Sequence, residues 1–459
     1  MLQNIKQDLA IPVAAGPEYC SQHPGYCVLS HFHPFLYLRP LMEILIRRAS
    51  IIDPSSPFHR QTAAILISNG TIVRIGDFDV PADTIIEAEG LCVSPGWMDL
   101  FSHFNDPGFE HKETIATGAR AAAAGGFTDV MVLPNTNPVV HNKSSVEYAV
   151  QRGRETGVNI HPIGAVTRNA EGKELAEMYD MHASGAVAFS DGIVPIQSAG
   201  LLIKALLYLK PIGATIIQVP DDQSLSSGGL MNEGVASTKL GLPGTPAIGE
   251  ELMIARDIEL LRYTGSRLHI TGVSTAKGID AIRKAKAEGL SLTCSVTPFH
   301  LRYIDEDLSG YDTNLKLRPA LRTAADRKAL QEAVLDGTVD AIAAHHFPQD
   351  TDSKVVEFEY AKHGMISLET AFSLVATAIP QLDAGRLAEL FCFGPRAAFG
   401  MQTPRVAENE RACLTLFQTE AAWTPRQFHS RSKNSVLTGT TLRGRPLGII
   451  SGANVFLNQ

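Results

Sequence analysis

The chain has 459 residues, of which 44% are hydrophobic and 19% are charged. This composition predicts a large packed core and is unlike that of a disordered protein. The 40 basic and 48 acidic residues leave a net charge of −8, and there is no basic tract, which disfavours nucleic-acid binding. The chain also lacks a run of about 18 apolar residues, so no membrane-spanning helix is predicted.

The first 41 residues differ from the rest, because they show neither a helical nor a strand-like period. They also lack the ordered basic, apolar and small-residue regions of a secretory signal. A zinc finger is disfavoured by the spacing of the segment's cysteines and histidines, which are Cys20, His23, Cys27, His31 and His33. We therefore expect residues 1–41 to be a disordered extension, or an upstream stretch translated in error, with Met42 as the true start.

Both ends of the remaining chain are rich in short strand-like runs. Residues 42–94 contain several such runs, separated by turn pairs such as Asp53-Pro54 and Asn69-Gly70. Residues 400–459 have the same texture, with ACLTLF and the long run from SVLTGTT to GANVF. The two ends together predict one small β-sandwich domain, which flanks a long central region.

The central region, residues 95–399, alternates apolar strands with helix-like stretches. Strand-like runs at 127–134, 158–166, 186–190, 214–220, 267–274, 290–298 and 336–346 are interleaved with helix-like runs at 144–157, 173–185, 196–213 and 276–289. Repeated β-α units predict a parallel sheet. The length and number of units favour an α/β fold of the (β/α)8 TIM-barrel type, in which reactive groups lie at the carboxyl ends of the strands.

The segment from Pro95 to Pro138 resembles the first barrel strand and following region of bacterial class I dihydroorotases, which belong to the amidohydrolase superfamily. Further segments fit the same family and extend the resemblance from Met42 to the C-terminus: MNEG at 231–234, RDIEL at 256–260, VST at 273–275, RPALRT at 318–323 and GMISLET at 364–370. The resemblance implies a metal-bearing barrel with a small β-sandwich. It also implies hydrolysis of the cyclic amide of dihydroorotate, in pyrimidine biosynthesis.

Hydrolysis of an unactivated amide at neutral pH needs a strong nucleophile and a polarised carbonyl, which one or two zinc ions can supply. The family pattern implies an HxH pair, an acidic bridge, two further histidines and a final aspartate. At four of these positions the chain has another residue, namely Phe101, Gln218, Gly272 and His345. His269, three residues before Gly272, is an unlikely substitute because side chains alternate along a strand.

Two expected metal ligands remain as vestigial candidates. His103 keeps the second position of HxH, although a single histidine at a strand end is more often structural. Asp191 keeps one acidic position beside Gly192, although an aspartate before glycine is also ordinary turn chemistry. His345 is the candidate catalytic residue, because histidine can bind a metal or accept a proton.

The candidate substrate-binding residues are also altered. Asn105 stands where the family has an arginine that holds the substrate carboxylate, so a bidentate cationic contact is missing. Asn137 of the NTNP segment is retained. Arg318 stands at a family asparagine, and Arg322 is retained.

These substitutions favour a catalytically inactive dihydroorotase-like protein that needs no cofactor. By family analogy, it would act as a scaffold for aspartate carbamoyltransferase. The alternative is an active dihydroorotase or related cyclic amidohydrolase, with zinc or with a metal-free site that uses His103, Asp191, His345 or His346. A third interpretation is a small-molecule binder, in which Asn137 and Arg318 hold an anion.

The surroundings of the protein are predicted from its cysteines and composition. Six cysteines without a CxxC pair favour a reduced, cytoplasmic protein. No membrane or nucleic-acid partner is expected, and the sequence leaves a homo-oligomer open.

Overall fold

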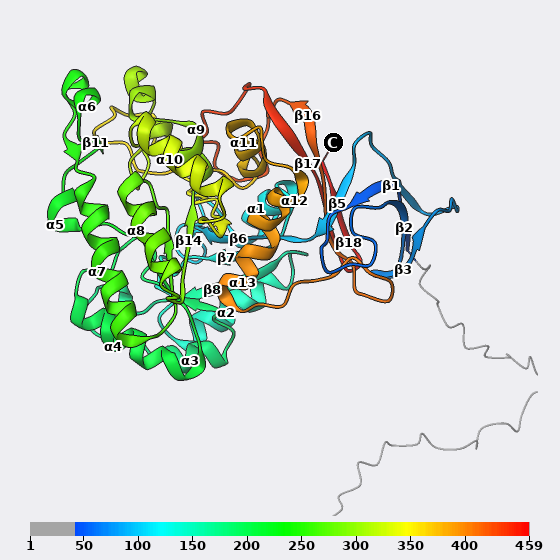
Figure 1. The fold of residues 1–459 in the computed structure, drawn as a ribbon, viewed down its shortest axis with the longest axis horizontal. Helices are drawn as coiled ribbons and strands as arrows, with labels where there is room; N and C mark the ends of the chain where they lie inside the picture. Colours follow the sequence, from blue (N-terminus) through cyan, green and yellow to red (C-terminus); the bar gives the residue numbers. More distant parts are fainter. Residues whose placement is uncertain (1–41, 459) are drawn as a thin grey trace, which may run out of the picture. The chain divides into compact units, whose positions relative to one another are not determined.

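The computed structural model describes residues 42–458, so the predictions made for residues 1–41 lie outside the described part of the chain. Figure 1 shows a barrel of parallel strands and a separate sheet, in which the blue start and red end of the described chain lie side by side. The predicted barrel with a small β domain built from both chain ends is therefore confirmed.

Within residues 42–458, eight parallel strands form the barrel sheet, in the order β15-β14-β13-β10-β9-β8-β7-β6. They are β6 (Trp97–Ser102), β7 (Phe127–Val132), β8 (Asn159–Gly164), β9 (Ala188–Phe189), β10 (Ile216–Gln218), β13 (Leu268–Thr271), β14 (Leu292–Val296) and β15 (Ala341–Ile342). The ends of the sheet meet beyond β15, where the His103 amide donates to the His346 carbonyl (2.9 Å). All residues of β6 and β7 are buried, as is typical of parallel strands covered on both faces.

Helices connect the strands and cover the barrel (Figure 1). They are α1 (Ile115–Ala124), α2 (Lys143–Gly153), α3 (Met178–Ala183), α4 (Ala199–Leu209), α5 (Gln223–Ser226), α6 (Val235–Leu240), α7 (Ile248–Thr264), α8 (Ala276–Ala287), α9 (Pro298–Arg302), α10 (Ala324–Leu335), α11 (Ala371–Ala378), α12 (Ala384–Ala388) and α13 (Gly394–Phe399). Many begin at a side chain that caps free backbone amides, such as Thr114 before α1 and Ser198 before α4. A two-stranded sheet, β11 (Met231–Asn232) and β12 (Gly244–Thr245), lies outside the barrel sheet.

One predicted helix is shorter than expected. Residues 173–185 have a helical pattern, but α3 begins only at Met178. The preceding residues extend alongside the chain after β8, where Leu175 bridges to Thr167 and the Ala176 amide donates to the Val166 carbonyl (2.9 Å). This pairing, between residues only eight to ten positions apart in the chain, prevails over the helical preference of the segment.

The second sheet joins the two ends of the described chain. Its main path runs β18-β17-β16-β5-β1-β2-β3, and β4 pairs with β1. The strands are β1 (Glu43–Ile51), β2 (Thr62–Ser68), β3 (Thr71–Gly76), β4 (Thr84–Ile86), β5 (Cys92–Pro95), β16 (Cys413–Trp423), β17 (Leu442–Ser451) and β18 (Asn454–Leu457). Leu414 pairs with Pro95 and Phe417 with Cys92, so the chain ends meet between β5 and β16.

An aromatic cluster joins the sheet to the barrel. Trp97 is fully buried, and its ring lies 5.1 Å from that of Phe417 in β16 and 4.7 Å from that of Phe372 in α11. The Trp97 amide also donates to Thr415 Oγ1 (3.0 Å). Burial of such large rings stabilises the contact by removing apolar surface from water.

No helix between residues 42 and 458 is long and apolar enough to cross a membrane. The four cysteines in this range, Cys92, Cys294, Cys392 and Cys413, are free thiols.

Candidate functional site

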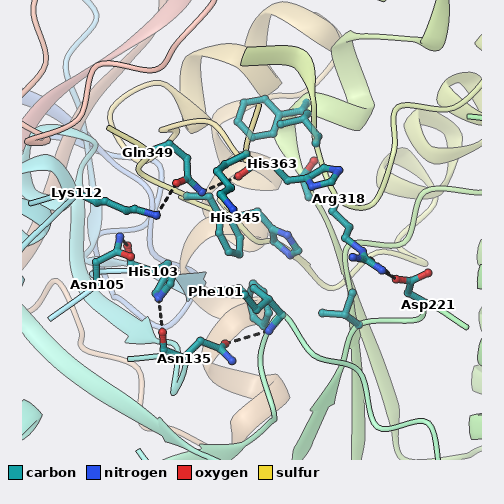
Figure 2. Close-up of a pocket in the computed structure, with 18 of the residues that line it drawn as sticks. Phe101, His103, Asn105, Lys112, Asn135, Asp221, Arg318, His345, Gln349 and His363 are labelled. Carbon is teal, nitrogen blue, oxygen red and sulfur yellow. Dashed lines mark hydrogen bonds and ion pairs between the residues drawn. The ribbon is translucent and has the colours of Figure 1, made fainter. Parts of the chain in front are cut away.

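A cavity of about 420 Å³ lies at the carboxyl ends of the barrel strands (Figure 2). Four of the predicted site residues line it, namely His103, Asn105, Arg318 and His345. Phe101, which stands where the family pattern has a histidine, also lines the cavity. This is the end of a (β/α)8 barrel where the strand-to-helix loops meet and active sites are found.

Two stacked rings occupy the centre of the cavity wall. Phe101 at the end of β6 and His345 beyond β15 stack with ring centroids 4.5 Å apart and planes 29° apart. The Phe347 ring lies 6.3 Å from Phe101 and 6.1 Å from His345. The wall is therefore aromatic at the point where the family pattern implies a metal ligand.

His345 is held by a chain of hydroxyl groups inside the barrel. Its Nε2 lies 2.9 Å from Thr271 Oγ1, which accepts a hydrogen bond from Ser295 Oγ (2.8 Å). The Nε2 atom of His345 is therefore engaged by the Thr271 hydroxyl, whichever of the two groups donates. Burial lowers the pKa of His345 to about 3, which keeps the imidazole neutral.

One ring nitrogen of His103 is also engaged in a hydrogen bond. Its Nε2 lies 2.8 Å from the Asn135 carbonyl oxygen. Because a carbonyl only accepts, Nε2 carries the proton and has no lone pair for a metal. Burial lowers the pKa of His103 to about 4, so the ring is a neutral donor at physiological pH.

The structure does not bring Asp191 to the cavity wall. Its carboxylate accepts hydrogen bonds from the Thr167 amide (2.8 Å) and hydroxyl (2.6 Å), and burial raises its pKa to about 6. The neighbouring Gly192 has a φ of 65°, and a Cβ there would lie 1.8 Å from Asn135 Oδ1. An aspartate at position 192 therefore has no room while Asn135 keeps its place.

Gly272 and Gln218, which stand at two further positions where the family pattern implies a metal ligand, also have structural roles. Gly272 has a φ of 71°, and a Cβ there would lie 2.9 Å from His345 Cε1. Gln218 points to the loop before α4, where its Nε2 donates to the Ile196 carbonyl (3.1 Å). His269, also considered from the sequence, is fully buried and binds Thr293 and Ser295.

The chemistry of these donors can be compared with that of a zinc centre. Zinc sites use three or more histidine, cysteine or carboxylate ligands that converge on one point. Nowhere in residues 42–458 do three such side chains come together in this way. The side chains of this cavity therefore do not fit a zinc centre in the arrangement described.

The candidate substrate-binding residues have separate environments. Arg318 donates through Nε to Asp221 Oδ2 (2.9 Å), so its charge is compensated. Asn105 has a φ of 61° and donates to the His103 carbonyl (3.4 Å). Asn137 is not among the lining residues, whereas Asn135, two residues earlier in NTNP, is. The turn directs Asn135 toward the cavity and joins the Asn137 amide to the Pro107 carbonyl (2.9 Å).

Several lining residues were not singled out from the sequence. Lys112 donates through Nζ to Gln349 Oε1 (2.9 Å), and the Gln349 side-chain amide donates to the His363 carbonyl (2.8 Å). Lys112 lies within the Pro95–Pro138 stretch that carries the family resemblance, so that stretch contained a usable signal. Gln349 and His363 lie in irregular loops, where no periodic pattern marks them.

Comparison with known proteins places the chain in a family. A sequence model described as Dihydro-orotase-like matches residues 90–278. A dihydroorotase of Pelotomaculum thermopropionicum is 41% identical over 426 residues, which cover 91% of this chain and 99% of the relative. The chain belongs to the dihydroorotase family.

Other similarities support the same placement. A dihydroorotase of Anaeromyxobacter sp. strain K is 39% identical over 421 residues, covering 90% of this chain and 97% of the relative. Among solved structures, an L-hydantoinase of Arthrobacter aurescens aligns with a TM-score of 0.78 at 22% identity, over 91% of this chain and 96% of that one. The structural match shows a shared fold.

Proposed function

We propose that this dihydroorotase-family protein does not hydrolyse dihydroorotate through a bound metal, and that it serves pyrimidine biosynthesis as a scaffold for aspartate carbamoyltransferase. The observation that carries the first part is the stack of Phe101 on His345 at the cavity wall. Phe101 has no metal-binding atom, and its ring packs in the position that the family pattern assigns to a histidine.

The neighbouring groups support the same proposal. His103 donates its Nε2 proton to a backbone carbonyl, and Asp191 binds Thr167. The Nε2 atom of His103 is therefore unavailable to a metal, and the Asp191 carboxylate is directed to Thr167. A metal-free hydrolysis would need a positioned base together with donors for the developing oxyanion. His345 has its Nε2 engaged and its pKa lowered to about 3 by burial, so it is a weak base.

The metal content and the activity of purified protein test the first part. Protein made without a metal-binding tag should contain near-zero zinc, iron and manganese by plasma mass spectrometry. It should also leave dihydroorotate unhydrolysed when zinc is added. One or two metal equivalents per chain, together with turnover, would contradict the proposal.

The scaffold role rests on the family resemblance and on the proposed absence of catalysis. Co-expression with the aspartate carbamoyltransferase of the same cell, followed by size-exclusion chromatography with light scattering, should give one complex that contains both chains. Separate elution of the two proteins at micromolar concentration would remove the scaffold role and leave the first part standing.

The second candidate is an active dihydroorotase with an atypical site. It is favoured by the names of the relatives, which are dihydroorotases at 37–41% identity over nearly the whole chain. These names support activity more directly than they support a scaffold. Turnover of dihydroorotate that is abolished by His103→Ala and by His345→Ala, but retained by His182→Ala at an exposed position away from the cavity, would establish this alternative.

A further inference from the structure

The charges around the cavity are unbalanced. Its charged lining residues are Lys112, Asp221, Arg318 and Lys362. The ion pair with Asp221 compensates Arg318 (2.5 Å), which leaves the two lysines. The lining histidines add no charge near neutral pH, because burial lowers their pKa values to about 3 or 4: His103, His300, His345 and His363.

Lys112 is positioned to meet a ligand. Figure 2 shows Lys112 and Asn105 on one side of the cavity and the Arg318–Asp221 pair on the opposite side. Lys112 is half-buried, and its side chain donates a hydrogen bond to the neutral Gln349 (2.9 Å). Asp350 acts on it at longer range, from outside the cavity lining. A buried anion would therefore find a cation and neutral amide donors on this side.

Much of the remaining lining is apolar and aromatic, beside the polar residues Asn135, Thr297 and His300. Phe101 and Phe347 lie beside the neutral His345 ring, and Phe299, Leu317 and Val219 complete this wall. Flat rings pack favourably against aromatic faces, in offset or edge-to-face arrangements. At about 420 Å³, the cavity is in the size range that encloses small organic ligands.

From these features we infer that the cavity binds an aromatic carboxylate. Its ring would lie against Phe101 and Phe347, and its carboxylate would accept hydrogen bonds from Lys112 Nζ and the amide of Asn105. The anion is thus held by Lys112, on the side where Asn105 replaces the arginine of the family pattern. The inference rests on the proposed function in one respect, because the ring uses space that a metal centre would otherwise occupy.

Calorimetric titration of the full-length protein with 2-naphthoate tests this inference. Binding in the micromolar range is expected, and the neutral isostere 2-naphthamide should bind at least about tenfold more weakly because it lacks the charge. Cyclohexanecarboxylate, which keeps the charge but not the flat ring, should also bind more weakly than 2-naphthoate.

Two variants separate the anion contact from general effects. Lys112→Met should weaken 2-naphthoate binding at least about tenfold while leaving 2-naphthamide binding unchanged. Lys173→Met, a surface lysine paired with Glu171, should change neither. Equal affinity for acid and amide in the unaltered protein, or no binding of 2-naphthoate at millimolar concentration, would overturn the inference. Equal affinity for cyclohexanecarboxylate and 2-naphthoate would overturn the inference that the ligand is aromatic.

The two tests nevertheless have distinguishable outcomes. If the protein carries zinc and hydrolyses dihydroorotate, the proposed function fails; binding of 2-naphthoate through Lys112 would then support the anion contact but overturn the placement of the ring against Phe101. If it is metal-free and inactive but does not bind 2-naphthoate, the proposed function stands and this inference fails.

Discussion

At the scale of residues, the cavity contains two non-glycine residues with left-handed backbones. Asn105 has a φ of 61° and His345 a φ of 48°. Asparagine and histidine are among the side chains that tolerate this region best, although it is uncommon outside glycine. Both follow the ends of barrel strands, so the loops that carry them are held by the surrounding structure rather than by local preference.

At position 272, the His345 ring leaves little room for a side chain larger than that of glycine. Gly272 has a φ of 71° and would place a Cβ 2.9 Å from His345 Cε1, whereas the exposed Gly213 has a φ of 64° and open space around it. Gly213→Ala should lower the free energy of unfolding by about 1–2 kcal/mol, which is the cost of the left-handed backbone alone. Gly272→Ala should cost at least about 1 kcal/mol more, because His345 must shift.

Urea unfolding followed by tryptophan fluorescence measures both variants. Equal losses for Gly272→Ala and Gly213→Ala would show that the His345 ring yields easily. In that case, the room at position 272 would not explain the absence of a larger side chain there.

At the scale of elements, the connection between β16 and β17 forms part of the barrel mouth. Residues 424–441 connect two strands of the second sheet and bind the backbone of three residues that line the cavity. Asn434 donates to the carbonyls of Phe347 and Gly364 (both 3.1 Å), and Ser432 donates to the Lys112 carbonyl (2.7 Å). The small β domain therefore positions the cavity residues as well as packing against the barrel.

The buried carboxyl group of Glu369 binds the connection between β16 and β17 to the segment before α11. Glu369 accepts hydrogen bonds from the backbone amides of His429 (2.9 Å) and Ser430 (3.0 Å), and burial raises its pKa from 4.5 to about 7. The folded state holds the proton on Glu369 more tightly than the unfolded state. The contribution of Glu369 to the free energy of unfolding is therefore fully present below pH 4.5. It is lost as the pH rises to about 7.

The corresponding test compares the unaltered protein with Glu369→Gln, which cannot titrate. Relative to that variant, the unaltered protein should lose about 3 kcal/mol of unfolding free energy between mildly acidic and mildly alkaline pH, at about 1.4 kcal/mol per unit of pKa shift. Urea unfolding across this range measures the difference. Glu332→Gln, on the exposed face of α10, is the control, and a Glu369→Gln profile parallel to it would contradict the assignment.

At the scale of the whole molecule, a buried ion pair ties the last barrel helix to an early strand. Arg396 in α13 donates to Asp129 in β7 (2.6 Å), and His161 in β8 binds the other oxygen of the same carboxylate (2.8 Å). Burial alone would raise the pKa of Asp129, but the hydrogen bond from His161 and the charge of Arg396 hold it at about 2. The carboxylate therefore stays ionised and links segments far apart in the sequence.

Removal of one partner should be costly. Arg396→Met should lower the free energy of unfolding by about 3–5 kcal/mol, because a buried carboxylate loses its cation. The exposed pair Arg283–Asp336 (3.0 Å) provides the control, and Arg283→Met should cost no more than about 1 kcal/mol. The double variant Arg396→Met/Asp129→Asn should lose less than the sum of the two single variants, and simple additivity would show that the pair does not interact.

The amino-acid sequence by itself determined the main elements of this protein. The apolar runs at 127–134 and 214–220 predict buried parallel strands, and the structure contains β7 and β10 there. The strand-like ends likewise predict the second sheet. Local period and composition suffice for these elements, because a strand or helix forms where its own residues can bury one face or both.

The family pattern, read from the same sequence, also directed attention to His103, Asn105, Arg318 and His345, which line one cavity. Which neighbouring side chain reaches that cavity was decided only by the tertiary structure. Asn135 faces it instead of Asn137, Asp191 turns to Thr167, and Lys112 joins from a loop. These outcomes depend on turn geometry and on contacts between segments far apart in the chain, which no local period encodes.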